Sequence, residues 1–222
     1  MDAEELLRCY AQGQRKFGYT PLVNLDLEGV DLSEASFNNI ENTNLKGACL
    51  RGTRFTSIKN SNFEGADLSD ARFSGTIEDS NFRGACLSKA NMDSSCFERC
   101  DLENATLERA AILGFFNTNL RRANLNKFYF MSRGKIENCN LEGATFRNAK
   151  LRDFVIERSS LRNADLKGMT GSGLSLIGVD LRGIINFVSP VFEEMHLQHT
   201  ILPDGRLVVQ ANAISVEEFG RL

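Results

Sequence analysis

Large apolar residues recur every five positions over most of the chain. Between residues 80 and 112 they occupy, without a slip, Phe82, Leu87, Met92, Phe97, Leu102, Leu107 and Ile112. An α-helix would repeat them every ~3.6 residues and a half-buried strand every two, so neither period fits. A small residue lies two positions before each of them, at Ser80, Ala85, Ala90, Ser95, Cys100, Ala105 and Ala110. The chain is therefore built from a repeated five-residue unit.

The five-residue spacing slips at intervals of four units. Spacings of three, four or six residues precede Ile40, Ile58, Ile77, Phe115 and Ile136. These slips predict a coil with four sides, about 20 residues per turn and one corner of variable length. In this register the first side carries Leu22, Ile40, Ile58, Ile77, Phe97, Phe115, Ile136, Ile156 and Leu176. Such columns bury apolar side chains against the coils above and below, as in a solenoid.

Polar positions also fall into columns. The residue after each second-side centre alternates in charge through Glu28, Lys46, Glu64, Arg83, Glu103, Arg121 and Glu142. With coils ~4.8 Å apart, neighbouring charges in this ladder can pair, and exposed pairs contribute roughly 0–1 kcal/mol each. Two residues after the same centres stand Gly29, Gly47, Gly65, Gly84, Asn104, Arg122, Gly143, Asn163 and Gly183. This column predicts a turn with positive φ, and Arg122 is the residue that does not fit it.

The unit resembles the A-(D/N)-L-x-x repeat of the pentapeptide-repeat family over residues 20–186. The resemblance implies an all-β fold, namely a right-handed quadrilateral parallel β-helix. The crossover preference of parallel strands independently predicts the same hand. About eight coils, stacked at ~4.8 Å, would give a solenoid roughly 40 Å long.

Both ends of a solenoid expose apolar core and unpaired backbone, so caps are expected. Residues 1–19 form a predicted N-terminal α-helical cap, in which Asp2 and Glu5 make a capping-box pattern and a helix over residues 2–12 ends near Gly13. Residues 187–222 form a predicted small C-terminal cap, with helix starts at Ser189 and Ser215 and a turn at residues 203–205. Some members of the family dimerise through this end, and its apolar content allows a dimer here.

The chain lacks the residue patterns that carry catalysis. Phosphate-binding, zincin and nucleophile-elbow motifs are absent, and the carboxylates lie at outward positions with no predicted cleft. The segment HLQH contains both histidines, His196 and His199, without a clear third ligand. We therefore expect no enzyme activity, no cofactor and no metal site.

Cysteine placement and the N-terminal sequence point to one compartment. Cysteines in the same column, such as Cys49 and Cys86, lie two coils or ~9.6 Å apart, beyond disulfide reach. The N-terminus lacks the apolar core of a secretory signal, and no run of 18 apolar residues predicts a membrane span. We expect free thiols in a reducing, cytoplasmic environment.

The middle coils depart most from the repeat. Phe128 replaces the usual small residue, and the variable corner is longest at residues 131–135. Apolar residues here take outward positions that are polar in other coils, with basic residues beside them. A cluster of this kind is typical of a protein-binding site. The candidate partner patch is Leu113, Phe116, Tyr129, Met131, Arg133 and Lys135. The alternative is that a distorted corner folds these side chains onto one another.

Two functions are compatible with this sequence. The first is a non-catalytic structural scaffold that presents a rigid repeat surface to a protein partner. The second is implied by the family resemblance: a DNA-mimic regulator of a type II topoisomerase (gyrase), as in quinolone-resistance members. Mimicry of DNA requires a strongly acidic surface, whereas residues 20–186 carry 21 acidic and 21 basic residues. Nucleic-acid binding is disfavoured because the basic residues are spread over several sides. The short N-terminal helix resembles that of cyanobacterial members, which implies no specific role.

Overall fold

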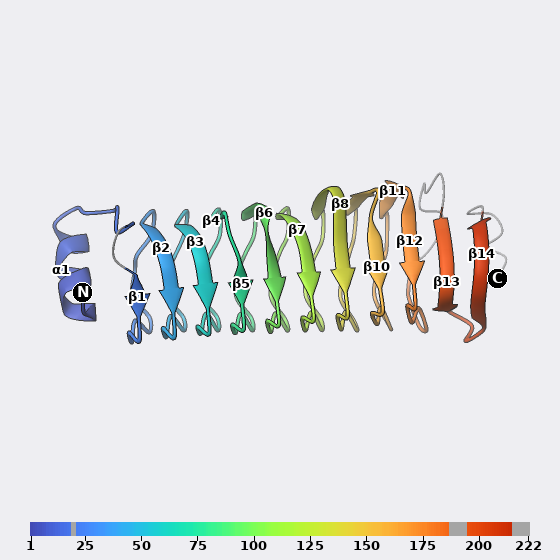
Figure 1. Cartoon of the computed structure of the whole chain (residues 1–222), viewed down its shortest axis with the longest axis horizontal. Helices are drawn as coiled ribbons and strands as arrows, with labels where there is room; N and C mark the ends of the chain where they lie inside the picture. The colour runs from blue at the N-terminus through green and yellow to red at the C-terminus, as the bar shows by residue number, and fades with distance from the viewer. Residues whose placement is uncertain (19–20, 187–194, 215–222) are drawn as a thin grey trace.

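The chain forms a straight rod of stacked coils with the N-terminal helix at one end and a strand pair at the other (Figure 1). The computed structural model describes residues 1–18, 21–186 and 195–214, with backbone alone for residues 130–133 and 210–214. Its only helix within these ranges is α1 (Ala3–Ala11). The strands are β1 (Leu22–Val23), β2 (Ser36–Glu41), β3 (Arg54–Lys59), β4 (Arg72–Phe73), β5 (Ile77–Glu78), β6 (Asn91–Glu98), β7 (Ala111–Phe116), β8 (Tyr129–Glu137), β9 (Lys150–Arg152), β10 (Val155–Glu157), β11 (Thr170–Ser172), β12 (Leu174–Ile177), β13 (Met195–Ile201) and β14 (Leu207–Ile214).

The four predicted sides are present, and we number them walls one to four by the columns that begin at Leu22, Leu27, Leu32 and Phe37. On wall one the parallel register runs without a break from Leu22 through each predicted centre to Leu176. It continues to Leu197 in β13, so the parallel sheet extends one rung beyond the last pentad. Walls two and three are joined by single bridges at every coil, for example between Asp26 and Asn44. The predicted parallel β-solenoid is confirmed.

Stacked aromatic rings fill much of the interior. On wall four the rings of Phe17, Phe37, Phe55 and Phe73 follow one another with centroids 5.4, 6.2 and 5.2 Å apart. On wall two Phe63 and Phe82 stack at 4.7 Å. All are buried. Each such pair contributes about 0.5–1.5 kcal/mol beyond the area it buries, so the column register itself stabilises the rod.

Left-handed backbone recurs at the turns. The predicted column has positive φ throughout, and Arg122 adopts it too, with φ 55°. Two further columns that the sequence analysis did not recognise share this conformation. One follows wall one and includes Asn42, Asn60 and Arg99, and the other follows wall three and includes Lys89. Asn and Asp tolerate this region better than most residues, which explains their frequency after wall one.

The length of the corner between walls four and one determines whether one side chain in that corner is exposed or buried. Where the two centres are three residues apart, the residue in the corner is exposed, as at Asn38, Thr56 and Leu113. Where they are five apart, the equivalent residue is buried, as at Ser95, Phe154 and Leu174. Longer corners therefore add a fifth inward position to the coil.

Both ends of the rod carry the predicted caps in part. Asp2 accepts a hydrogen bond from the Glu5 backbone N–H at 2.8 Å, and Leu6 is buried against the first coil, which confirms the helix. At the other end β14 pairs antiparallel with β13 across the predicted turn at residues 203–205. The helix starts predicted at Ser189 and Ser215 lie outside the described residues. No helix in the described part of the chain is long and apolar enough to cross a membrane.

Candidate partner-binding surface

Two apolar side chains of the predicted patch are exposed in the middle of the rod. Leu113 is 41% exposed, because its corner between walls four and one is of the three-residue kind. Tyr129 begins β8 on wall four and is 51% exposed. Its register partners on that wall are Ala111 in the preceding coil and Lys150 in the following one. Because Ala111 is small, the side of the ring that faces the preceding coil is left open.

Phe116 and Lys135 lie round the corner, on wall one. The Phe116 ring packs against its own strand, so that a Cβ built on Gly114 would lie 3.1 Å from Phe116 Cε2. Lys135 Nζ lies 2.7 Å from Glu137 Oε2 and 3.0 Å from Glu157 Oε2. These bonds raise the pKa of Lys135 and neutralise its charge locally. Both side chains are half-buried and belong to the edge of the surface.

Two further patch residues, Met131 and Arg133, lie in β8, but their side chains are outside the described residues. Phe128, which replaces the usual small residue of its column, is not part of this surface. It is fully buried, and its ring centroid lies 6.3 Å from that of Phe115. The same column holds Ala110 below and Ala149 above, so Phe128 fills interior space that small residues occupy in the neighbouring coils.

Lys150 and Arg152 lie on β9 of wall four, one coil beyond Tyr129, and the sequence analysis missed them. Both are exposed, and neither forms an ion pair with a described residue. The signal was present in the register, since Lys150 occupies the position of Tyr129 one coil later. The exposed apolar pair therefore has free positive charge on one side. Leu113, Tyr129, Lys150 and Arg152 together are called the mid-rod patch below.

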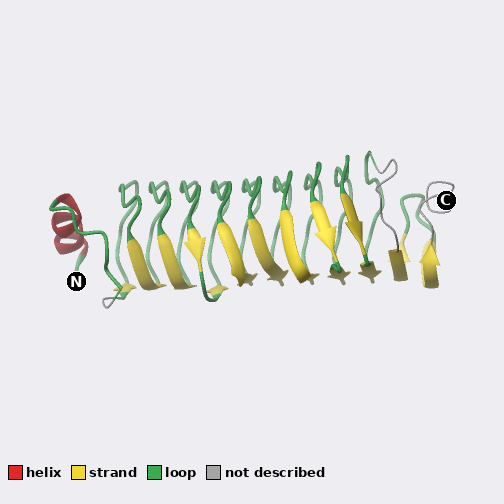
Figure 2. Cartoon of the chain, turned by 90° about the horizontal axis from the view of Figure 1, so that it is seen from above, coloured by secondary structure: helices red, strands yellow, loops and turns green. Residues whose placement is uncertain are grey.

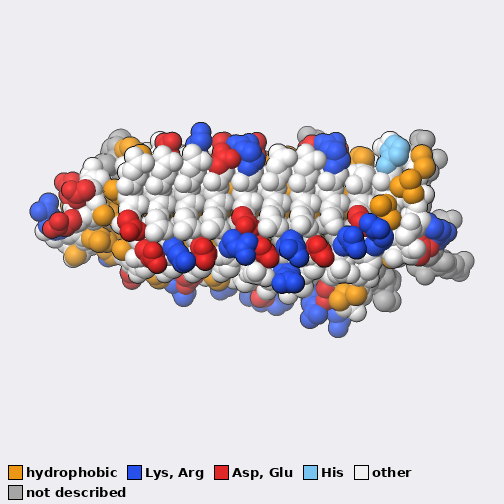
Figure 3. Space-filling view, turned by 90° about the horizontal axis from the view of Figure 1, so that it is seen from below, with side chains coloured by type: hydrophobic (Ala, Val, Ile, Leu, Met, Phe, Trp, Pro, Cys, Tyr) orange, Lys and Arg blue, Asp and Glu red, His pale blue; other side chains and the backbone are white. Residues whose placement is uncertain are grey.

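Wall four differs from the other walls in its charges. On wall two the ladder forms ion pairs between Lys46 and Glu64 at 3.5 Å, Arg83 and Glu103 at 2.6 Å, and Arg121 and Glu142 at 3.7 Å. Figure 3 shows this row of alternating side chains along one face of the rod. On wall four, by contrast, no described cation has an acidic partner. These cations are Lys16, Arg54, Arg72, Lys150 and Arg152.

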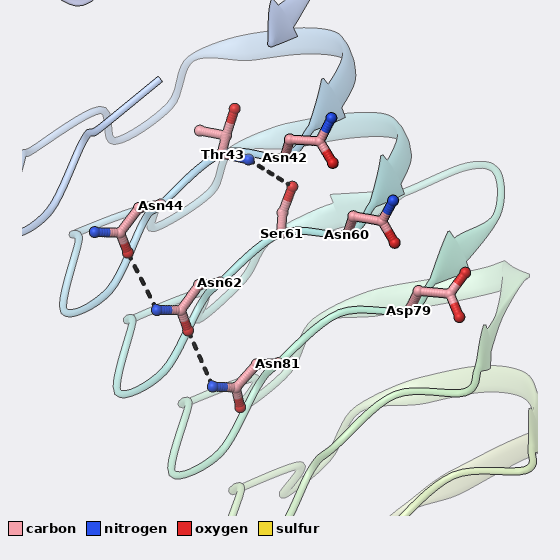
Figure 4. Close-up of a pocket in the computed structure, with 8 residues that line it drawn as sticks. All are labelled: Asn42, Thr43, Asn44, Asn60, Ser61, Asn62, Asp79 and Asn81. Atoms are coloured by element: carbon pink, nitrogen blue, oxygen red, sulfur yellow. Dashed lines mark hydrogen bonds between the residues drawn. The ribbon is translucent and has the colours of Figure 1, made fainter. Parts of the chain in front are cut away.

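A second surface, at the corner between walls one and two, is polar and internally satisfied. Asn81 Nδ2 donates to Asn62 Oδ1 at 3.0 Å, and Asn62 Nδ2 donates to Asn44 Oδ1 at 3.1 Å (Figure 4). The same oxygens also accept backbone N–H groups, as Asn62 Oδ1 does from Glu64. The shallow hollow beside this amide ladder holds about 380 Å³. Because its groups already bond one another, the ladder serves the register of the coils.

The described histidines, cysteines and carboxylates are not gathered into a metal centre. Among the described residues no group of three or more His, Cys, Asp or Glu side chains is placed to hold a metal ion. His196 and His199 are exposed on β13. All six cysteines are free thiols.

A family model for pentapeptide repeats matches eight copies of the unit, over residues 22–57, 56–77, 78–109 and 139–185. The chain belongs to the pentapeptide-repeat family. The matched segments stop at residue 109 and resume at 139, so the family pattern lapses over the stretch that holds Leu113, Phe128 and Tyr129. The match to the unit is therefore missing in this pentapeptide-repeat protein over the stretch in which Leu113 and Tyr129 are exposed.

Three solved pentapeptide-repeat structures illustrate the likeness. HetL from the cyanobacterium Nostoc sp. strain PCC 7120, involved in heterocyst differentiation regulation, is 24% identical with a TM-score of 0.44, covering 94% of this chain and 100% of HetL. QnrB1, a plasmid-mediated fluoroquinolone resistance protein, is 18% identical with a TM-score of 0.30, covering 81% of this chain and 94% of QnrB1. Rfr23 from the cyanobacterium Cyanothece 51142 is 17% identical with a TM-score of 0.23, covering 82% of this chain and 97% of Rfr23. No curated protein sequence matches the chain.

Proposed function

We propose that this protein is a non-catalytic scaffold that binds a protein partner through the mid-rod patch. The observation that supports this most is the joint exposure of Leu113 and Tyr129 where the repeat pattern lapses. Large exposed apolar residues beside free cations are typical of binding surfaces, in which an aromatic anchor provides much of the affinity. Lys150 and Arg152 would attract a partner whose contact surface is acidic.

The solenoid suits this role because its surface is held before binding. Each coil is fixed by backbone hydrogen bonds and stacked side chains on both sides, so little ordering is required when a partner docks. The free thiols are consistent with a cytoplasmic location. Leu207 and Val209 on β14, each 58% exposed, are the residues through which a dimer of the C-terminal cap would form.

Regulation of gyrase by DNA mimicry is the second candidate, since QnrB1 is a fluoroquinolone resistance protein of the same family. The balance of 21 acidic and 21 basic residues over residues 20–186 favours the scaffold instead. Ion pairing on wall two further lowers the negative potential that mimicry needs. Inhibition or protection of gyrase in a supercoiling assay at sub-micromolar protein would reverse this ranking.

The scaffold proposal is tested with two matched double variants. L113S/Y129S removes the exposed apolar pair, and V23S/I185S removes two apolar side chains of similar exposure, 37% and 51%, on other walls. Tagged wild-type and variant chains are used to capture partners from the native host, after circular dichroism has verified the fold. We expect a protein that wild type and V23S/I185S capture equally and that L113S/Y129S loses. Equal capture by both variants would reject the patch.

A further inference from the structure

A hollow of about 380 Å³ lies on wall four near the N-terminal end, far along the rod from the mid-rod patch. It spans β2, β3 and β4 and is lined by Ser36, Phe37, Asn38, Arg54, Phe55, Thr56, Arg72 and Ser74. Its size is within the range of small-molecule sites. No acidic side chain lines it.

The hollow lies beside an interruption in the sheet. The sheet is interrupted between β4 and β5, where residues 74–76 form no ladder with β3 (Figure 2). At this point Gly75 passes so close to the coil before it that a Cβ there would collide with the Thr56 carbonyl group. Only glycine allows this approach, and the interrupted stretch begins at Ser74, which lines the hollow.

Two arginines flank this space on adjacent rungs. Arg54 and Arg72 are register partners, so their side chains leave the wall ~4.8 Å apart at the backbone. Like charges directly opposite each other on adjacent strands destabilise a sheet. On wall two, by contrast, the residues that are adjacent between coils alternate between positive and negative charge. Both arginines are exposed, and neither forms an ion pair with any described residue, although residues 20–104 carry 14 acidic and 8 basic residues.

The carboxylates at the corner that precedes wall four do not offset this charge directly. Glu34 lies two residues before Ser36, and Asp70 lies two residues before Arg72, both at the corner between walls three and four. Neither carboxylate forms an ion pair with Arg54 or Arg72. The Glu34 side chain instead lies near Gly52, whose Cβ would be 3.7 Å from Glu34 Cγ. Arg54 and Arg72 are therefore adjacent like charges, and a bound anion would reduce the repulsion between them.

Neutral donors complete the lining. The hydroxyl groups of Ser36, Thr56 and Ser74 and the amide of Asn38 lie along the same hollow. Ser74 Oγ donates to the Phe55 carbonyl at 3.4 Å, a long bond that an oxyanion could replace. Guanidinium groups match the oxygens of phosphate with paired, charge-assisted hydrogen bonds, and hydroxyl groups add further donors.

We propose that this hollow is a binding site for a small molecule that carries a phosphate group. The two guanidinium groups bind the phosphate oxygens, and the hydroxyl groups of Ser36 and Thr56 orient the rest of the ligand. The site is independent of the partner surface, since it uses other coils and other residues.

The experiment is a titration of ¹⁵N-labelled protein with inorganic phosphate and with glycerol phosphate, at constant ionic strength set by chloride. We expect saturable shifts of backbone amide signals within residues 36–38, 54–56 and 72–74. R54Q/R72Q should weaken both ligands by more than about tenfold, as expected for lost charged hydrogen bonds. K150Q/R152Q removes the same charge from the same wall outside the hollow and should change the dissociation constant by less than twofold.

Two results would overturn the site. The first is the absence of saturable shifts in the wild type at millimolar ligand. The second is equal weakening by the two double variants, which would show that phosphate responds to net charge alone. Because all four side chains are exposed and form no ion pair with a described residue, both variants should fold, and their thermal unfolding midpoints provide the check.

Discussion

At the scale of single residues, the turns require conformations that most side chains avoid. Twenty described residues other than glycine have positive φ, and they include long side chains such as Lys89, Arg109 and Arg122. Only the column in which Gly dominates was recognised from the sequence, although the column after wall one is rich in Asn. The column after wall three was harder to recognise, because Gly52 and Asn148 alternate there with charged residues such as Lys89, which carry no local sign of left-handed backbone. The stacked coils impose this conformation, and its cost is met by the packing of neighbouring coils.

The cysteines illustrate how position in a coil controls reactivity. Burial raises the pKa of Cys100 to about 12 and that of Cys139 to about 11. Burial also opposes ionisation of Cys86, but hydrogen bonds with Ser69 and Ser88 outweigh it and hold the pKa of this thiol below its ordinary value. Cys86 is half-buried, whereas Cys100 and Cys139 are buried.

We therefore expect Cys86 to be alkylated by iodoacetamide at pH 8 at least about a hundredfold faster than Cys100 or Cys139, because the thiolate is the reactive form. Peptide mass spectrometry over a time course measures the three rates. In guanidinium chloride the rates should converge, which serves as the control. Similar rates in the native protein would contradict the burial of the Cys100 and Cys139 thiols.

At the scale of elements, β8 explains why the mid-rod patch was only partly predictable. The outward apolar residues Leu113 and Tyr129 could be recognised from the repeat register, and both are exposed. The pairing of Lys135 with Glu137 and Glu157 could not, since it depends on side chains from two coils meeting on wall one. Phe128 was recognised as an anomaly, and its column is buried at Ala110 and Ala149 too, but the interior space that accommodates a phenylalanine could not be predicted from the sequence.

Replacing Phe128 by Ala tests this account of β8. The residue is fully buried, so truncating its ring to a methyl group leaves a cavity in the interior. We expect F128A to lower the free energy of unfolding by about 3–5 kcal/mol. Urea denaturation followed by circular dichroism gives the value.

The control is L113A, which truncates an exposed side chain in the preceding coil and should change the free energy of unfolding by about 0.5 kcal/mol or less. A loss below about 1 kcal/mol for F128A would mean that the coil adapts to the small residue found elsewhere in the column.

At the scale of the whole molecule, ion pairs form on walls one, two and three, whereas no described cation of wall four has one. Seven described carboxyl groups have pKa values below their ordinary range. The causes are hydrogen bonds, for example from Ser33 to Asp31, from Lys127 to Glu108 and from Arg182 to Asp180. The fold and the four walls could be predicted because each coil repeats the same signal. The ladder on wall two could also be predicted, and three of its neighbouring pairs form. Ion pairs outside that ladder, such as Arg99 with Asp79, could not, because they depend on side-chain geometry between coils.

These shifts predict acid sensitivity with a definite sign. Each folded pKa lies below its unfolded value, so the contribution to stability is complete above the unfolded pKa and is lost as the pH falls through the folded one. We expect the thermal unfolding midpoint to fall steeply below about pH 4, where free carboxyl groups take up protons. Differential scanning calorimetry between pH 7 and pH 2.5 measures it. A midpoint that stays constant to pH 3 would contradict the shifts.

The variable corner between walls four and one has a consequence for how such a rod can diversify. Two residues more or fewer at this single bend move one side chain between solvent and interior, as the contrast of Leu113 with Phe154 shows. The rungs on either side keep their register in both cases. Short insertions or deletions at this bend can therefore create or erase a surface anchor in one step, and the tube that carries it stays intact.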